Sequence, residues 1–251
     1  MHQIPDAVDP LLYKLADGLP KPVGSNLVGL YVYGSVLGPE FDPDRSDVDC
    51  IAVTRRPLDG ATFRRLEAWL TEAVLEEPWF ARLQMPVLVK QKVLVDDPQA
   101  CLYQFGVLKR SGSDGNPIIW MDFFWRGRTL IGPDPKSFIP EITADILHRA
   151  LVREVEYLRE ELVARPDGEW RDIFSYRAYA ILTLCRILYS FRTGDVTSKP
   201  KAARWAMGQT PIEWHDLIQR ALGAGEIGGL EQLPISRIAA FIDYVNGQLN
   251  P

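Results

Sequence analysis

Hydrophobic positions follow two different rhythms along this chain, one in each half. In the first half, short apolar runs are bounded by Gly, Ser, Asp and Pro, which is typical of buried β-strands joined by turns. Apolar residues at helical spacing between Ala61 and Glu77 predict one amphipathic helix, which ends before Pro78. The runs that predict strands are "NLVGLYVYGS", "SDVDCIAVTRRP" and "MPVLVKQKVLVDDP". The order strand, strand, helix, strand predicts a small α+β unit with a mixed sheet.

The second half has helical spacing up to its end. Thr143 can cap a first helix, and "SYRAYAILTLCRILYSF" is apolar nearly all round, as expected for the central helix of a bundle. The Pro- and Gly-rich stretch "IGPDPKSFIP" separates the two patterns. We therefore expect two domains, 1–135 and 136–251, with a ligand site in a cleft between them.

Composition narrows the class of protein. Of the 251 residues, 47% are hydrophobic and 24% are charged, which is ordinary for a soluble globular protein. A net charge of -5 gives no basic footprint, so we expect no nucleic-acid partner. The three cysteines form no CxxC pair, and no apolar stretch approaches the length of a membrane span. These features predict a cytoplasmic protein with buried thiols and no membrane partner, and they say nothing about its oligomeric state.

One short segment carries the clearest chemistry. Asp47 and Asp49 straddle Val48 at the start of an apolar run, so in a strand both carboxylates share one face. Two like charges held side by side need a cation between them. Gly34 allows close approach of the backbone, and Ser35 adds a hydroxyl that can bind a phosphate oxygen. Each half of the pattern is weak alone, but together they predict a site for Mg²⁺ and a nucleoside triphosphate.

The same segment, "YGSVLGPEFDPDRSDVDCIAV", resembles the signature of nucleotidyltransferases. In the second half, "LTLCRILYSFRTGDVTSKPKAARWAM" and the junction "TLIGPDP" resemble the aminoglycoside adenylyltransferases that modify streptomycin and spectinomycin. The resemblance implies an N-terminal nucleotidyltransferase domain and a C-terminal helical bundle. It also implies Mg²⁺, ATP as co-substrate, and transfer of AMP to a hydroxyl of a small polar acceptor, with an aminoglycoside favoured.

The resemblance also implies roles for individual residues. Two carboxylates would hold Mg²⁺ and take part in catalysis, the Gly-Ser turn would contact the triphosphate, and two cations from the second half would reach the phosphates. Other readings stay open for the cations: the arginine could form a salt bridge inside the bundle, and the lysine could be a solvated loop residue. Asp47 and Asp49 are the two carboxylates, Gly34 and Ser35 form the Gly-Ser turn, and Arg186 and Lys199 are the two cations.

The sequence departs from the family at the third carboxylate, which acts there as the general base. That carboxylate belongs to the strand after the amphipathic helix, where it falls on Val89 or Gln91, depending on the register. Neither side chain can accept a proton at neutral pH. Asp122 is the nearest carboxylate without another assigned role.

The acceptor-contacting stretch departs as well. The tryptophan that the family uses against streptomycin appears here as Leu162. Asp167, Trp170 and Asp172 are the candidate contacts to a polycationic acceptor, although a charged loop between helices explains them equally well.

Three other functions remain open at this stage. The missing carboxylate favours a catalytically weakened or inactive nucleotide-binding protein. The same chemistry on a non-antibiotic acceptor is a second alternative, and an interaction protein of the toxin–antitoxin type is a third.

Overall fold

The computed structural model describes residues 4–44, 46–113, 115–165, 167–168, 171–223 and 232–250. Its backbone contacts divide the chain into two compact units, Met1–Glu141 and Ile142–Pro251. This division lies beyond the boundary expected after residue 135. The reason is that the segment after residue 135 still packs on the first unit, where the Phe138 ring lies 6.0 Å from the Tyr31 ring.

Six strands in the described part of the first unit form one sheet. The sheet is mixed, as the sequence predicted, but the sequence indicated only three of its strands. The strand order is β5-β4-β3-β2-β1-β6. β2 and β3 are parallel, and every other neighbouring pair is antiparallel. The strands are β1 (Leu27–Tyr33), β2 (Val48–Thr54), β3 (Leu83–Val89), β4 (Cys101–Gln104), β5 (Val107–Arg110) and β6 (Arg128–Ile131).

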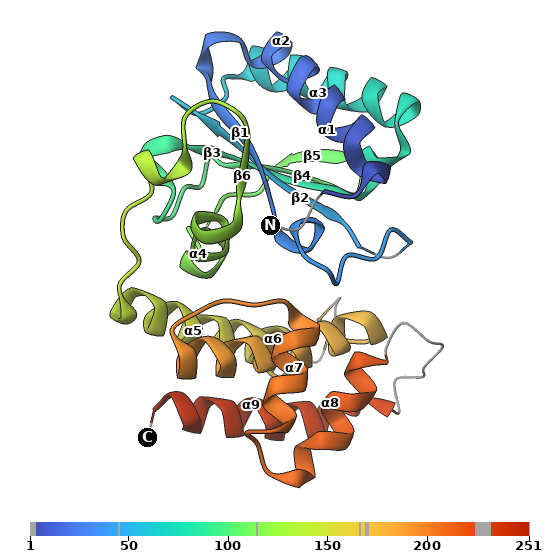
Figure 1. The fold of residues 1–251 in the computed structure, drawn as a ribbon, viewed down its shortest axis with the longest axis vertical. Coiled ribbons are helices and arrows are strands. Elements are labelled where there is room, and N and C mark those ends of the chain that lie inside the picture. The colour runs from blue at the N-terminus through green and yellow to red at the C-terminus, as the bar shows by residue number, and fades with distance from the viewer. Residues whose placement is uncertain are drawn as a thin grey trace. The chain divides into compact units, whose positions relative to one another are not determined.

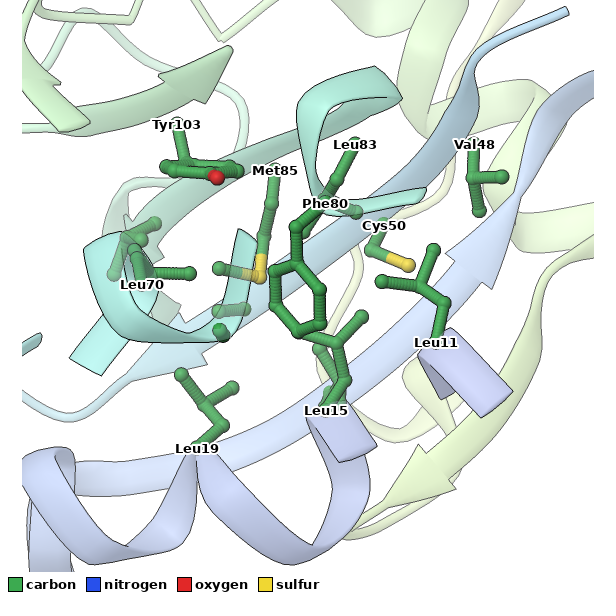
Figure 2. Packing of buried hydrophobic residues seen from close by; sticks show 14 of the residues in the cluster. Leu11, Leu15, Leu19, Val48, Cys50, Leu70, Phe80, Leu83, Met85 and Tyr103 are labelled. Carbon is green, nitrogen blue, oxygen red and sulfur yellow. The ribbon is translucent and has the colours of Figure 1, made fainter. Parts of the chain in front are cut away.

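Helices cover both faces of this sheet (Figure 1). On one face lie α1 (Asp9–Gly18), α2 (Pro20–Val23) and α3 (Gly60–Glu76), and on the other lies α4 (Pro117–Arg126). The core beneath α1 and α3 takes alternate residues from each strand. Figure 2 shows Val48 and Cys50 of β2 beside Leu83 and Met85 of β3, facing the leucines of α1. Residues between these in the sequence therefore point to the opposite face.

Some predicted elements differ from the structure. The third strand was expected to run through residues 85–98, but β3 ends at Val89 and a 3₁₀ turn, Lys90–Lys92, follows it. The β4–β5 hairpin and β6 were not predicted. Each of these strands has only four residues, too few for an alternating pattern to stand out.

The second unit is helical, as predicted. Its first helix begins as expected, because the Thr143 hydroxyl accepts a hydrogen bond from the Ile146 amide. A single π-helical turn, Glu160–Ala164, follows that helix. α6 is buried on most sides, which agrees with its nearly continuous apolar sequence. The helices are α5 (Ala144–Arg159), α6 (Phe174–Thr193), α7 (Lys199–Met207), α8 (His215–Leu222) and α9 (Ile235–Leu249).

Two further expectations can be compared with the structure. Cys50, Cys101 and Cys185 are buried free thiols, as the sequence predicted. In the part of the chain that the structure describes, no helix is both long and apolar enough to cross a membrane.

Candidate functional site

Asp47 and Asp49 lie on the same side of the sheet, as predicted. Val48, between them, is fully buried in the core under α1 and α3, so its two neighbours turn toward the opposite face. Asp49 belongs to β2, whereas Asp47 is the last residue of the preceding loop. Both are half-buried. Their carboxylates therefore stand at the edge of the sheet face that also carries α4.

The strand register identifies the neighbours of this pair. Asp49 pairs with Tyr33 on β1 and with Gln84 on β3. Gln84 also donates a hydrogen bond from Nε2 to Oδ2 of Asp47. An amide on the neighbouring strand thus contacts one carboxylate and lies beside the other.

This register corrects the position expected for a third carboxylate. Val89 pairs with Thr54, five residues along β2 from Asp49 and therefore about 17 Å away. Gln91 lies beyond the end of β3. The β3 residue at the level of the aspartates is Gln84, which lies before the apolar run that begins at Met85 and predicted this strand.

The turn after β1 fits closely around Asp49. Gly34 opens the 3₁₀ turn η3 (Gly34–Leu37) with φ +79°, a conformation that favours glycine. A Cβ added to Gly34 would lie 2.3 Å from Oδ2 of Asp49. The next residue, Ser35, is half-buried, and its hydroxyl makes no hydrogen bond to any residue that the structure describes. The Gly-Ser pair thus brings backbone and a hydroxyl beside a carboxylate.

Negative charge accumulates around Tyr33. Burial raises the pKa of this phenol well above its usual value, and the charges of Asp49, Asp122 and Asp47 raise it further. Asp122 comes from α4, where Arg126 forms an ion pair with it at 2.6 Å. Phe123, next to Asp122, packs against the Tyr33 ring at 6.2 Å between centroids. A divalent cation at the aspartate pair would offset part of this charge.

A second arginine fixes the loop that delivers Asp47. The Arg82 guanidinium donates hydrogen bonds to the carbonyl oxygens of Pro43, at 2.5 Å, and of Ser46. The same guanidinium lies 4.5 Å from the centroid of the Trp79 ring. Inside the loop, the Asp42 amide donates to the Ser46 hydroxyl at 3.0 Å. These contacts hold the backbone next to Asp47, a positioning role that the sequence did not indicate.

The residues at this site fit a magnesium ion. Mg²⁺ prefers oxygen ligands and is commonly held by one or two carboxylates together with substrate phosphates. Asp47 and Asp49 supply two carboxylates, and the missing side chain at Gly34 leaves space beside them. Among the described residues, no group of three or more His, Cys, Asp or Glu gathers into a metal-binding cluster. The site therefore better fits a cation whose remaining ligands come from a bound polyanion than a cation whose ligands all come from the protein.

Both predicted cations of the second unit interact with the same tyrosine, Tyr179. Lys199 is not in a loop, as one reading had it, but is the first residue of α7, a helix that the Ser198 hydroxyl caps. Its Nζ lies 4.3 Å from the centroid of the Tyr179 ring. Arg186, which is half-buried on α6, acts electrostatically on the same tyrosine. Burial raises the pKa of Tyr179, the charge of Glu154 raises it further, and the Arg186 guanidinium lowers it.

The alternative reading of Arg186, a salt bridge inside the bundle, is not found among the described residues. No carboxylate in the described part of the chain forms an ion pair with this guanidinium.

The predicted acceptor contacts have different surroundings. Asp167 lies in an exposed turn after the π-helical turn. Asp172 is also exposed, but it forms an ion pair at 3.1 Å with Arg177, a nearly buried arginine. Leu162 is fully buried in the core of the second unit. Trp170 lies outside the described residues.

The chain is similar to several known proteins. Residues 137–247 match the family model described as the C-terminal domain of aminoglycoside adenylyltransferase. The spectinomycin 9-adenylyltransferase of Campylobacter jejuni is 23% identical over 244 residues, which cover 89% of this chain and 88% of that protein. The aminoglycoside (3'') (9) adenylyltransferase of Escherichia coli is 26% identical over 243 residues, which cover 89% and 88% of the two proteins.

A solved structure shares the fold. The spectinomycin adenyltransferase of Enterococcus faecalis, crystallised with ATP and spectinomycin, superposes with a TM-score of 0.71 at 19% identity. The match covers 96% of this chain and 99% of that one. The relatives span nearly the whole chain, and the family model covers its helical unit. Residues 137–247 therefore match the C-terminal domain of the aminoglycoside adenylyltransferases, and nearly the whole chain is similar to members of that family.

Proposed function

We propose that this protein transfers AMP from ATP to a hydroxyl of an aminoglycoside in the presence of Mg²⁺ and releases pyrophosphate. The observation that carries the proposal is the placement of Asp47 and Asp49 on one sheet face, with the Gly34 turn against Asp49. Nucleotidyl transfer needs this combination of paired carboxylates for a cation and accessible backbone for phosphates. The names of the relatives support the same reaction.

In this proposal each residue of the first unit has a defined task. Asp47 and Asp49 would hold Mg²⁺, which when bound neutralises phosphate charge and favours attack at phosphorus. Gly34 lets the backbone approach the triphosphate closely, and Ser35 donates its hydroxyl to a phosphate oxygen. Arg82 keeps Asp47 in place through the carbonyl oxygen of Ser46.

Two cations of the second unit are assigned to the nucleotide phosphates. Arg186 suits a bidentate contact because its guanidinium presents paired donors. Lys199 is held over Tyr179, so its ammonium loses little conformational freedom when it binds a phosphate. An acidic chain that binds a polyanion needs local positive charge of this kind.

Spectinomycin is the first acceptor to test. Relatives named spectinomycin 9-adenylyltransferase match about nine-tenths of the chain, and the related structure contained spectinomycin. The position of the family's streptomycin-contacting tryptophan is the buried Leu162, which favours spectinomycin over streptomycin. Asp167 is exposed and can attract a polycationic acceptor, whereas Asp172 already neutralises Arg177.

Incubation with ATP labelled at the α-phosphate tests the proposal. The protein is mixed with spectinomycin, streptomycin or a panel of other aminoglycosides, in Mg²⁺ or in EDTA, and labelled products are separated and counted. We expect label on at least one acceptor in Mg²⁺ and none in EDTA. Label on no acceptor, by a protein that binds MgATP, would instead identify a nucleotide-binding protein without transferase activity.

A further inference from the structure

Transfer of AMP to a hydroxyl requires that a proton leave the acceptor. In the reaction proposed above, on which this inference rests, the acceptor oxygen bonds to the α-phosphorus while the bond from that phosphorus to the bridging oxygen breaks. Pyrophosphate leaves with the electron pair, and the hydroxyl proton must pass to a base. A side chain can serve as this base only if it reaches the attacking oxygen directly or through one water.

The sheet register leaves few side chains in that position. The attacking hydroxyl must approach the phosphate that the aspartate pair would hold, so the nearest groups on the sheet are the cross-strand neighbours of Asp49. These are Tyr33 and Gln84, each one strand away, or about 4.8 Å. Asp122 of α4, the other carboxylate close to Tyr33, is held in an ion pair with Arg126. Tyr33 carries a phenol, which is protonated at neutral pH and cannot take the proton.

Gln84 cannot take the proton either. Its Nε2 is a donor to Asp47, and its amide oxygen accepts hydrogen bonds but not protons in water near neutral pH. The contact with Asp47 places the Gln84 side chain directly against a carboxylate of the proposed metal site. The amide is therefore well placed to hold an acceptor hydroxyl and unable to ionise it.

We infer that Gln84 occupies the base position of this site, and that its neutral amide makes removal of the acceptor proton limit the rate of transfer. In the native chain the proton passes to solvent water as the new bond to phosphorus forms. A carboxylate in place of the amide would take the proton and accelerate the same step. Gln84 thus sets how fast this chain works, independently of how tightly it binds nucleotide.

The test compares Gln84→Glu with Gln91→Glu. Both variants exchange an amide for a carboxylate, but Gln91 lies beyond the end of β3. Single-turnover transfer to spectinomycin is measured with enzyme in excess, and MgATP affinity is measured by calorimetry. We expect the transfer rate of Gln84→Glu to rise by about 100-fold, since a positioned base contributes roughly 10²–10⁴-fold. Gln91→Glu should transfer at the wild-type rate.

A second variant covers the possibility that a third carboxylate weakens MgATP binding by repulsion from Asp47. Gln84→Ala leaves a gap in which added formate can act as the missing base. Its transfer rate should rise with formate concentration, while the wild-type rate should not. This arm decides the question if Gln84→Glu does not bind MgATP.

The outcomes separate this inference from the proposed function. Transfer by the wild-type protein, with no gain in Gln84→Glu and no formate response, would overturn the inference and leave the function standing. A gain of equal size in both glutamate variants would also overturn it, because the position would then not matter. Absence of transfer in every variant and acceptor, with MgATP bound, would remove both.

Discussion

Gly34 lies so close to the Asp49 carboxylate that no residue with a side chain fits in place of the glycine. A Cβ on Gly34 would lie 2.3 Å from Oδ2 of Asp49 and 3.1 Å from its Cγ. The φ angle of +79° at Gly34 excludes most side chains independently. The conformation of the turn after β1 and the position of the Asp49 carboxylate therefore depend on each other, and a change at either should disturb the other.

Gly34→Ala should displace the Asp49 carboxylate and weaken MgATP binding by more than about 10-fold, in the range found when the support of a metal ligand is lost. The strained φ adds a loss of about 1 kcal/mol in unfolding free energy. Gly24→Ala is the matched control, because Gly24 has φ +64° but a Cβ there meets nothing within 4 Å. Calorimetry and thermal melts of both variants should show similar strain but lost MgATP affinity only for Gly34→Ala. If both variants bind MgATP equally well, the contact with Asp49 has no role in binding.

Asp47→Asn and Asp49→Asn should each fold normally and lose most of their Mg²⁺-dependent affinity for ATP. Asparagine keeps the shape of the side chain but removes the charge that a hard cation prefers. Asp44→Asn provides the control, since Asp44 is an exposed residue of the same loop. Circular dichroism confirms the fold, and calorimetry in Mg²⁺ measures affinity. Wild-type affinity in either the Asp47 or the Asp49 variant would show that the pair has only a structural role.

Arg82→Ala should lower MgATP affinity by about 10-fold, although in the proposed site Arg82 contacts neither metal nor nucleotide. Arg82 lies immediately before β3, and its guanidinium donates to the loop carbonyl oxygens of Pro43 and Ser46. Without it, the backbone before Asp47 is less restrained. Arg82→Lys keeps the charge but cannot donate two divergent hydrogen bonds, so it should lie between wild type and alanine. An equal loss of MgATP affinity in the lysine and alanine variants would show that the two hydrogen bonds of the arginine matter and its charge does not. No loss of affinity in either variant would contradict the positioning role.

Lys199→Ala should weaken MgATP binding by about 10-fold, the effect expected when one charge-assisted hydrogen bond to phosphate is lost. Because Lys199 lies over Tyr179, its removal should also cost about 0.5–1 kcal/mol of stability. Lys201→Ala, an exposed position in α7, should change neither property. Chemical denaturation gives the stability and calorimetry gives the affinity. A stability loss without an affinity loss would show that Lys199 only packs on the tyrosine.

The sequence predicted this fold where its patterns are long. The apolar runs of β1 and β2, the helical spacing of α3 and the cap at Thr143 all lie where expected. The same is true of the shared face of Asp47 and Asp49, since alternation along a strand is a local property.

Relations between distant segments were harder to predict. Gln84 faces Asp49 only through the parallel register of β2 and β3, which depends on how the connecting helix α3 packs on the sheet and leaves no local signal. Arg82 acts through carbonyl oxygens, which no side-chain pattern reveals. The position of Lys199 could have been recognised, because Ser198 and Pro200 are typical of the first turn of a helix.

The central claim is that Asp47 and Asp49 bind nucleotide through a divalent cation, and titration of the wild-type protein with ATP tests it most directly. Heats of binding are measured in Mg²⁺, and again in EDTA at the same ionic strength. The account predicts clear binding in Mg²⁺ and a loss of more than about 10-fold in EDTA, because two carboxylates repel a bare triphosphate. Equal affinity under the two conditions would contradict the cation site and the transfer mechanism built on it.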